Sequence, residues 1–147
     1  MNFSKYLAID YGEKRIGIAI SDYDKNIAFP RDHVLNDIKL FQKILVLIKE
    51  ESIEKIILGY PINLNSEKTP QTLKVESFKK ELEEFLSKNK IKTEVVLFDE
   101  RLTSSMAESY ITEMGLKKSK RQEKGLVDSI AAQVLLQGYL DKEKKIN

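Results

Sequence analysis

The hydrophobic pattern at the start of the chain predicts three successive strands. Lys5–Asp10 is a short apolar run followed by Gly12, which is typical of a buried strand. Arg15–Ser21 alternates isoleucine with small residues, and the short connection before it predicts a hairpin with the first strand. Ile27–Leu35 supplies a third strand, in which Pro30 favours an edge position because proline cannot donate to a ladder. The chain is therefore expected to begin with an antiparallel meander.

After Asn36 the apolar spacing changes and predicts helices that alternate with strands. A helix is expected to begin with Asn36 or Asp37 as its N-cap and to bury the stripe Ile38, Phe41, Leu45 and Ile48. A second helix is expected to open at Thr69–Pro70, with the stripe Phe78, Leu82, Phe85 and Leu86. The other expected elements are strands at Lys55–Gly59 and Glu94–Asp99, a loop at Tyr60–Thr69, a helix at Ser104–Met114, a loop at Gly115–Gly125 and a final helix at Leu126–Leu140. This order predicts an α/β domain around a central mixed five-stranded sheet, an antiparallel β-meander followed by βα crossovers, flanked by helices.

Length and composition narrow the class of protein. The 147 residues suit a single domain, 1–147, with a short charged tail at 141–147, and 41% hydrophobic and 33% charged residues fit a folded chain. The absence of cysteine excludes disulfides, thiolate metal sites and cysteine nucleophiles. The start of the chain does not resemble a signal peptide, and no apolar stretch approaches the ~20 residues of a membrane helix. We expect a cytoplasmic protein without a membrane partner.

The net charge of +2 fits almost any partner, but the basic residues are unevenly distributed. One short segment, residues 115–125, contains a single acid and the basic residues Lys117, Lys118, Lys120, Arg121 and Lys124. This basic segment is either a solvated loop or a patch that contacts nucleic-acid phosphates. The second interpretation gains weight only if catalytic groups lie nearby.

Two strands are expected to end in acidic residues. Asp10 closes an apolar run, so it either caps the following turn or binds a cation that offsets the partial burial of its charge. Asp99 and Glu100 stand together at the end of another strand. Because successive strand residues face opposite sides, at most one of these two acids shares the face of Asp10. The other is expected in a surface salt bridge, for which Arg101 is a candidate.

Asp128 lies on the final helix, at the border of its expected buried stripe, which is Val127, Ile130, Ala131, Val134 and Leu135. The helix dipole explains an acid near the N-terminus, but not the small residues Ala131 and Ala132 beside it, which leave space around the carboxylate. Two strand-end acids and one helical acid can converge at one edge of a mixed sheet, where they repel one another unless cations neutralise them. Mg²⁺ or Mn²⁺ fits such oxygen ligands, and two ions about 3.5–4 Å apart can support phosphodiester hydrolysis.

Four sequence blocks include these acids. They are LAIDYGEKRIGIAISD (Leu7–Asp22), LGYPIN (Leu58–Asn63), FDERLT (Phe98–Thr103) and VDSIAA (Val127–Ala132). In this order they resemble the signature of the YqgF family, whose members are described as Holliday junction resolvases and as nucleases of the small-subunit ribosomal RNA precursor. Any one block is a weak signal, but four in order span nearly the whole chain and are highly specific.

The resemblance implies a ribonuclease H-like fold and metal-dependent phosphodiester cleavage. It also implies that Asp10, Glu100 and Asp128 are the catalytic, metal-binding acids, with Glu100 preferred over Asp99. Related resolvases carry an aspartate three positions beyond the equivalent of Asp128, where this chain has Ala131. The metal affinity or the number of ions held would then differ, unless Asp99 or a substrate phosphate completes the metal shell.

Several residues near these blocks are candidates for contacts with nucleic acid: Lys14, Arg15, Arg101, Asn63, Lys117, Lys118, Lys120 and Arg121. Structural ion pairs are the alternative for the basic residues, and an ordinary polar connection is the alternative for the loop of Asn63. The expected partner is a ribosomal RNA precursor, processed at its 5′ end during ribosome biogenesis, or branched DNA. Junction resolution usually needs a dimer whereas RNA trimming does not, so we expect a monomer or a weak homodimer.

Two other functions remain open. The Asp10-Tyr11-Gly12 turn also resembles the phosphate-binding start of actin-like ATPases, but those proteins need two such lobes and 147 residues supply one. A non-catalytic nucleic-acid-binding assembly factor would explain the basic segment and the missing fourth acid. The presence of three acids beside phosphates argues against a pure binding protein.

Overall fold

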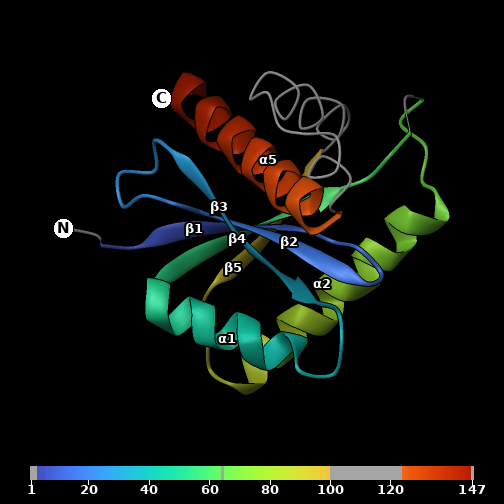
Figure 1. Cartoon of the computed structure of the whole chain (residues 1–147), viewed down its shortest axis with the longest axis horizontal. Coiled ribbons are helices and arrows are strands. Elements are labelled where there is room, and N and C mark those ends of the chain that lie inside the picture. The colour runs from blue at the N-terminus through green and yellow to red at the C-terminus, as the bar shows by residue number, and fades with distance from the viewer. Residues whose placement is uncertain (1–2, 64, 100–123, 147) are drawn as a thin grey trace.

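The computed structural model describes residues 3–63, 65–99 and 124–146, which form a mixed five-stranded sheet with flanking helices (Figure 1). The strands are β1 (Lys5–Asp10), β2 (Arg15–Ser21), β3 (Ala28–Leu35), β4 (Ile53–Tyr60) and β5 (Glu94–Asp99). Their spatial order is β3-β2-β1-β4-β5. β1, β2 and β3 pair antiparallel, whereas β4 is parallel to both β1 and β5. The predicted meander followed by crossovers is confirmed, as is the edge position of β3.

Helices cover both faces of the sheet. α1 (Leu40–Glu51) and α2 (Pro70–Lys88) lie on one face, and α5 (Lys124–Ile146) crosses the other over β3, β2 and β1 (Figure 1). Burial on both faces explains why the sequence of β1 is an almost continuous apolar run. None of the described helices is long and apolar enough to cross a membrane.

The two faces of the sheet carry side chains of different size, as the alternation along β2 shows. Its isoleucines enter the core beneath α1 and α2: Ile16, Ile18 and Ile20. The sheet residues that lie beneath α5 include a glycine and several alanines: Gly17, Ala8, Ala19 and Ala28. Because these residues are small, the backbone of α5 approaches the sheet closely. The first residues of α5 are therefore positioned by the smallest side chains of the sheet.

The start of α2 has the cap that the sequence predicts. Thr69 is the N-cap: its hydroxyl accepts a hydrogen bond from the backbone nitrogen of Thr72, whose own hydroxyl accepts one from the backbone nitrogen of Thr69. Pro70 occupies the first turn. The buried Thr72 hydroxyl also contacts the carbonyl oxygen of Pro61, which ties α2 to the loop after β4.

The start of α1 differs from the sequence prediction. The helix begins at Leu40 with Lys39 as N-cap, and no side chain caps it. The carboxylate of Asp37 instead accepts a hydrogen bond from the backbone nitrogen of Lys39, which forms a turn ahead of the helix. This turn removes Ile38 from the helical stripe, and its side chain is 99% exposed. The prediction that Ile38 is buried was therefore wrong.

The last helix is longer than predicted at both ends. α5 begins at Lys124, so this residue and Gly125 belong to the helix and not to the basic loop. It continues to Ile146, so residues 141–146 are not a separate charged tail. Glu143 anchors the last turns, because its carboxylate accepts hydrogen bonds from the Tyr6 hydroxyl (3.0 Å) and the Lys55 ammonium (3.3 Å). Burial, together with the bond to Glu143, raises the pKa of Tyr6 to about 12.

Three residues of the predicted buried stripe of α5 are buried, Ile130, Ala131 and Leu135, but only Leu135 of these belongs to the core cluster against the sheet. The residues buried against the sheet are Ala132, Leu135, Leu136 and Leu140. Ile130 and Ala131 belong to a separate small cluster on the helix. α5 is apolar on two sides, and the sequence pattern alone does not decide between them. Asp128 lies one turn before Ala132 and is therefore on the side that faces the sheet.

Candidate active site

Asp10 ends β1 on the face of the sheet that α5 covers. Ile9 enters the core beneath α1 and α2, whereas Ala8 packs beneath α5, so alternation assigns Asp10 to the α5 face. Its cross-strand partner is Gly17, and directly opposed residues of an antiparallel pair project to the same side. The half-buried Asp10 therefore stands beside the position where α5 contacts β2.

Gly17 brings α5 into direct contact with the sheet. A Cβ atom at this position would lie 2.1 Å from the backbone oxygen of Asp128 and 3.2 Å from its Cβ, so a side chain cannot fit unless the helix moves. Because paired strands are about 5 Å apart, the Cα atom of Asp10 lies within roughly 10 Å of the Cβ atom of Asp128. Two acids that are distant in the sequence are thus adjacent to the same glycine.

The first turns of α5 are fixed by polar contacts with β2 and β3. The Nε atom of Arg15 lies 3.3 Å from Oδ2 of Asp128, and the two side chains are 27% and 28% exposed. The hydroxyl of Ser129 donates a 2.8 Å hydrogen bond to the carbonyl oxygen of Arg31. The guanidinium of Arg15 offsets the repulsion that Asp128 would otherwise exert on Asp10.

The turn after Asp10 is held from two directions. A Cβ atom at Gly12 would lie 2.4 Å from a backbone oxygen across the turn, so the turn needs glycine. The side-chain amide of Asn36 donates to the Gly12 carbonyl (2.9 Å), and that of Gln71 donates to the Tyr11 carbonyl (3.4 Å). The sequence does not reveal this role for either amide, because both lie far along the chain from the turn and only the fold brings them to it.

Asp99 ends β5 on the opposite face from Asp10. Val95 enters the core beneath α1 and α2 and Phe98 packs beneath α5, so alternation assigns Asp99 to the Val95 face. In the part of the chain that the structure describes, no three acids, histidines or cysteines are grouped so as to hold a metal ion. Asp99 therefore does not complete a three-acid site with Asp10 and Asp128. Glu100 lies outside the described residues, and its role stays a prediction.

Ala131 is the residue at the position where the resemblance led us to expect a fourth acid. It is 4% exposed and packs beside Ile130. An alanine offers no ligand atom, so the described part of the site contains two carboxylates, those of Asp10 and Asp128.

The residues predicted to contact nucleic acid have different surroundings. Lys14 is exposed on the turn after Asp10. The side-chain oxygen of Asn63 accepts hydrogen bonds from two backbone nitrogens of its own loop (3.0 and 2.9 Å), which agrees with the structural alternative for this residue. The remaining candidates lie outside the described residues and stay predictions: Arg101, Lys117, Lys118, Lys120 and Arg121.

The loop between β4 and α2 is braced by Glu76. This carboxylate lies 2.9 Å from the Lys68 ammonium and accepts a 2.7 Å hydrogen bond from the Tyr60 hydroxyl. The bonds from Lys68 and Tyr60 lower the pKa of Glu76, and the bond to Glu76 raises the pKa of Tyr60. The end of β4, its loop and α2 are thereby joined beside the candidate site.

Solved structures with this fold include Holliday junction resolvases. RuvC of T. thermophilus, in complex with a Holliday junction substrate, matches with a TM-score of 0.58 and 11% identity over 96% of both chains. The yeast mitochondrial resolvase Ydc2 matches with a TM-score of 0.60 and 12% identity over 99% of this chain and 81% of its own. The fold is therefore ribonuclease H-like, and its pair of acids, Asp10 and Asp128, lies at one end of the sheet.

The sequence itself assigns the family. Residues 4–142 match the family RuvX, described as Holliday junction resolvase. A relative from Sulfurihydrogenibium is 40% identical over 95% of this chain and 91% of its own, and is assigned as a pre-16S rRNA nuclease. A relative from Ruminiclostridium cellulolyticum with the same assignment, pre-16S rRNA nuclease, is 40% identical over 94% of both chains. The chain belongs to the RuvX family, as its resemblance to YqgF implied, and is a nuclease, a hydrolase of phosphodiester bonds.

Proposed function

We propose that this protein is a metal-dependent nuclease that processes the 5′ end of the small-subunit ribosomal RNA precursor. The observation that carries the proposal is the approach of Asp10 and Asp128 over Gly17 at one edge of the sheet. Full-length relatives at 40% identity, assigned as pre-16S rRNA nucleases, support an RNA substrate. A cytoplasmic location and a monomeric or weakly dimeric state are part of the same proposal.

The donor set at this edge fits Mg²⁺ or Mn²⁺. Both ions prefer carboxylate oxygens, which Asp10 and Asp128 supply from β1 and α5. Glu100 is the third acid of the proposal, because Asp99 belongs to the other face. A divalent ion bound there would activate a water molecule and neutralise charge on the leaving oxygen.

Arg15 and Lys14 are proposed to position the substrate backbone. Arg15 pairs with Asp128 at 3.3 Å, so its charge already lies beside the carboxylates. Lys14 is exposed on the same turn and adds a second positive charge. Contacts of this kind with phosphates dominate the affinity of proteins for nucleic acid and fix the position of the strand.

A second candidate function is the resolution of four-way DNA junctions. It is favoured by the description of the family and by the resolvases that share the fold. Resolution needs two symmetric cuts and usually a symmetric dimer, whereas trimming of one RNA end needs a single site. The two functions therefore predict different products from the same carboxylates.

Cleavage of the two substrates side by side tests the proposal. An end-labelled fragment of the ribosomal RNA precursor and a four-way DNA junction are incubated with increasing Mg²⁺ or Mn²⁺, with a chelator as control. We expect metal-dependent cuts in the RNA that the chelator abolishes. Paired symmetric cuts in the junction, with the RNA intact, would favour resolvase activity instead. Binding without cleavage at any metal concentration would contradict a nuclease and favour a non-catalytic assembly factor.

A further inference from the structure

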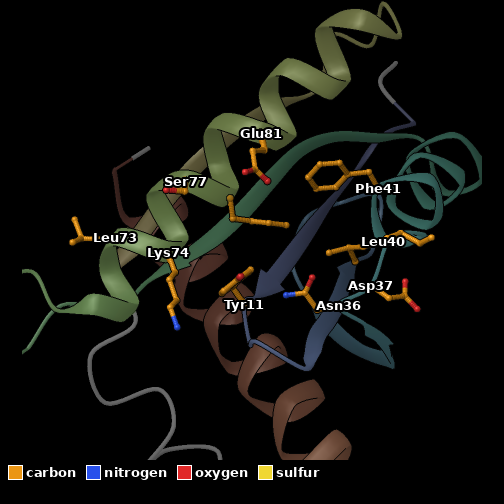
Figure 2. Close-up of a pocket in the computed structure, with 11 residues that line it drawn as sticks. Tyr11, Asn36, Asp37, Leu40, Phe41, Leu73, Lys74, Ser77 and Glu81 are labelled. Carbon is orange, nitrogen blue, oxygen red and sulfur yellow. The ribbon is translucent and has the colours of Figure 1, made fainter.

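A pocket of about 580 Å³ opens on the other face of the same sheet edge (Figure 2). It lies between the turn after β1, the start of α1 and the first half of α2. Its volume falls within the roughly 300–1,000 Å³ that is typical of small-ligand sites. Tyr11 lines the pocket and directly follows Asp10 in the chain, so the pocket begins one residue away from the candidate active site.

Three aromatic rings line this pocket, those of Tyr11, Phe41 and Phe78. Phe78 is 5% exposed, and its ring centroid lies 4.9 Å from that of Tyr11 and 5.8 Å from that of Phe41. Tyr11 and Phe41 are only half-buried, so part of each ring is accessible. Accessible aromatic faces bind planar heterocycles by stacking.

Two large apolar side chains at the pocket are left in water. Ile38 is 99% exposed and Leu73 is 55% exposed, and both line the pocket. Apolar area in contact with water is unfavourable, and a group of such side chains at a cavity marks a surface that is covered on binding. A flat ring in the pocket would cover part of this area.

The polar groups of the pocket favour a nucleobase over a phosphate. Asp37 and Glu81 line it together with the hydroxyl of Ser77. Figure 2 shows Glu81 on α2 and Asp37 near the start of α1, on different sides of the pocket. Two carboxylates repel a phosphate, but they accept hydrogen bonds from the amino groups of adenine, cytosine and guanine. Lys74, which also lines the pocket, is paired with Glu13 of the turn.

We infer that this pocket binds one unpaired nucleobase of the substrate strand, next to the phosphate at Asp10 and Asp128, and favours bases with an exocyclic amino group. The inference rests on the proposed nuclease function. The Cα atoms of Asp10 and Tyr11 are consecutive and therefore about 3.8 Å apart. A nucleic-acid strand that passes over Asp10 can thus place a neighbouring base against Tyr11. A base within a duplex is stacked and paired and cannot enter, so the pocket selects a single-stranded region beside the cut.

Filling the pocket tests this inference. Ser77 is exposed on α2 and lines the pocket, so Ser77→Trp occupies the space without entering the core. Ser87→Trp is the matched control, since Ser87 is exposed near the other end of the same helix and does not line the pocket. Glu81→Ala is a second variant that removes an acceptor without adding bulk. Affinity is measured for short single-stranded RNAs in chelator, with one abasic position moved along the strand.

The wild-type protein and Ser87→Trp are expected to lose affinity when one particular position is abasic. Ser77→Trp is expected to bind the intact RNA roughly 5- to 150-fold more weakly than the wild-type protein, which corresponds to the loss of one stacked base. Its affinity is not expected to fall further when that position is abasic. Glu81→Ala is expected to reduce the preference for adenine over uracil there. The inference is overturned if folded Ser77→Trp binds the intact strand as tightly as the wild-type protein, or if no abasic position weakens wild-type binding.

The absence of metal from the binding assay separates this inference from the nuclease proposal. Base-dependent binding without any metal-dependent cleavage would contradict the nuclease and support the pocket. Cleavage of the RNA precursor with unaltered binding by Ser77→Trp would support the nuclease and overturn the pocket.

Discussion

Gly17 determines how closely Asp128 approaches Asp10. Its neighbours Ile16 and Ile18 face the other side of the sheet, and the space above Gly17 is filled by the backbone of α5. A Cβ atom there would lie 2.1 Å from the backbone oxygen of Asp128, which cannot yield without movement of the helix. The glycine thus contributes to the candidate site through the absence of a side chain.

Gly17→Ala is expected to lower the free energy of unfolding by about 1–3 kcal/mol, the range for an overpacked interior position. RNA cleavage should fall more than RNA affinity, because the two carboxylates separate while the basic residues remain. Gly138→Ala is the matched control, since a Cβ atom there would lie 3.6 Å from the ring of Phe98, an ordinary contact. Denaturant unfolding and cleavage are measured for both variants. Full cleavage by Gly17→Ala would show that this contact does not set the geometry of the site.

The sequence reveals the chemistry of a single residue more readily than it reveals which residues surround it in the fold. Asp10 and Asp128 can be identified because each is an acid at the border of an apolar pattern. The roles of Gly17 and Asn36 cannot, because their contacts arise only after α5 and the segment after β3 have packed against the first hairpin. Contacts between residues far apart in sequence leave no mark in a local pattern.

Elements are predictable where one local signal is strong. β5 has the expected bounds, and α2 begins after the expected cap, Thr69. The start of α1 was mispredicted because Asp37 uses its carboxylate to form a turn and not to cap the helix. Ile130, Ala131 and Leu135 of the predicted stripe of α5 are buried, but the stripe does not identify the side that meets the sheet, because the helix is apolar on two sides.

The end of α1 is tied to the sheet by Glu51. Its carboxylate lies 3.4 Å from the Lys5 ammonium and 3.0 Å from the Arg31 guanidinium. Burial by itself would raise the pKa of Glu51, but the hydrogen bond from Arg31 and the charge of Lys5 outweigh it, and the pKa is lowered. A carboxyl group with a lower pKa in the folded state stabilises the fold above its ordinary pKa of 4.5 and loses this contribution as the pH falls through the lowered value.

Glu51→Gln is therefore expected to reduce the free energy of unfolding at neutral pH, by about 1 kcal/mol or less because the partners are partly exposed. The difference from the wild-type protein should shrink in acid, where both side chains are uncharged. Chemical unfolding at several pH values measures this difference in the free energy of unfolding. Glu50→Gln, at an exposed neighbouring position, is the control. A difference that stays constant into strong acid would show that the charge of Glu51 does not contribute.

The basic segment of residues 115–125 leads into α5, the helix that carries Asp128. Replacement of Lys117, Lys118, Lys120 and Arg121 by alanine is expected to weaken RNA binding. The slope of the logarithm of the binding constant against the logarithm of the salt concentration should become shallower by roughly 0.7 per lost phosphate contact. A variant with four other exposed lysines replaced controls for net charge: Lys49, Lys80, Lys88 and Lys92. The RNA affinity of both variants, measured over a range of salt concentrations, distinguishes a patch that contacts phosphates from a solvated loop. Equal salt slopes for the two variants would identify the segment as a solvated loop.

At the scale of the whole molecule, the end of the sheet at which β1, β4 and β5 finish borders two surfaces, one on each face of the sheet. α5 brings Asp128 to one face of this end, and α1 and α2 enclose the pocket on the other (Figures 1 and 2). The mixed topology places the carboxyl ends of β1, β4 and β5 together there, because these strands are parallel. The sequence predicts this topology and the acids, but not the pocket, whose walls come from three separate segments of the chain.

The most direct test of the proposed site compares two aspartates that both end strands of this sheet, Asp10 on the α5 face and Asp99 on the opposite face. Cleavage of the ribosomal RNA precursor in Mn²⁺ is measured for Asp10→Asn and Asp99→Asn, with folding and RNA affinity checked for each. Asp10→Asn is expected to lose more activity than the roughly 10- to 100-fold typical when a partner of a metal ligand is removed, and to remain folded and able to bind RNA. Asp99→Asn is expected to cleave at the wild-type rate. Wild-type cleavage by Asp10→Asn, or an equal loss in both variants, would contradict a metal site on the α5 face.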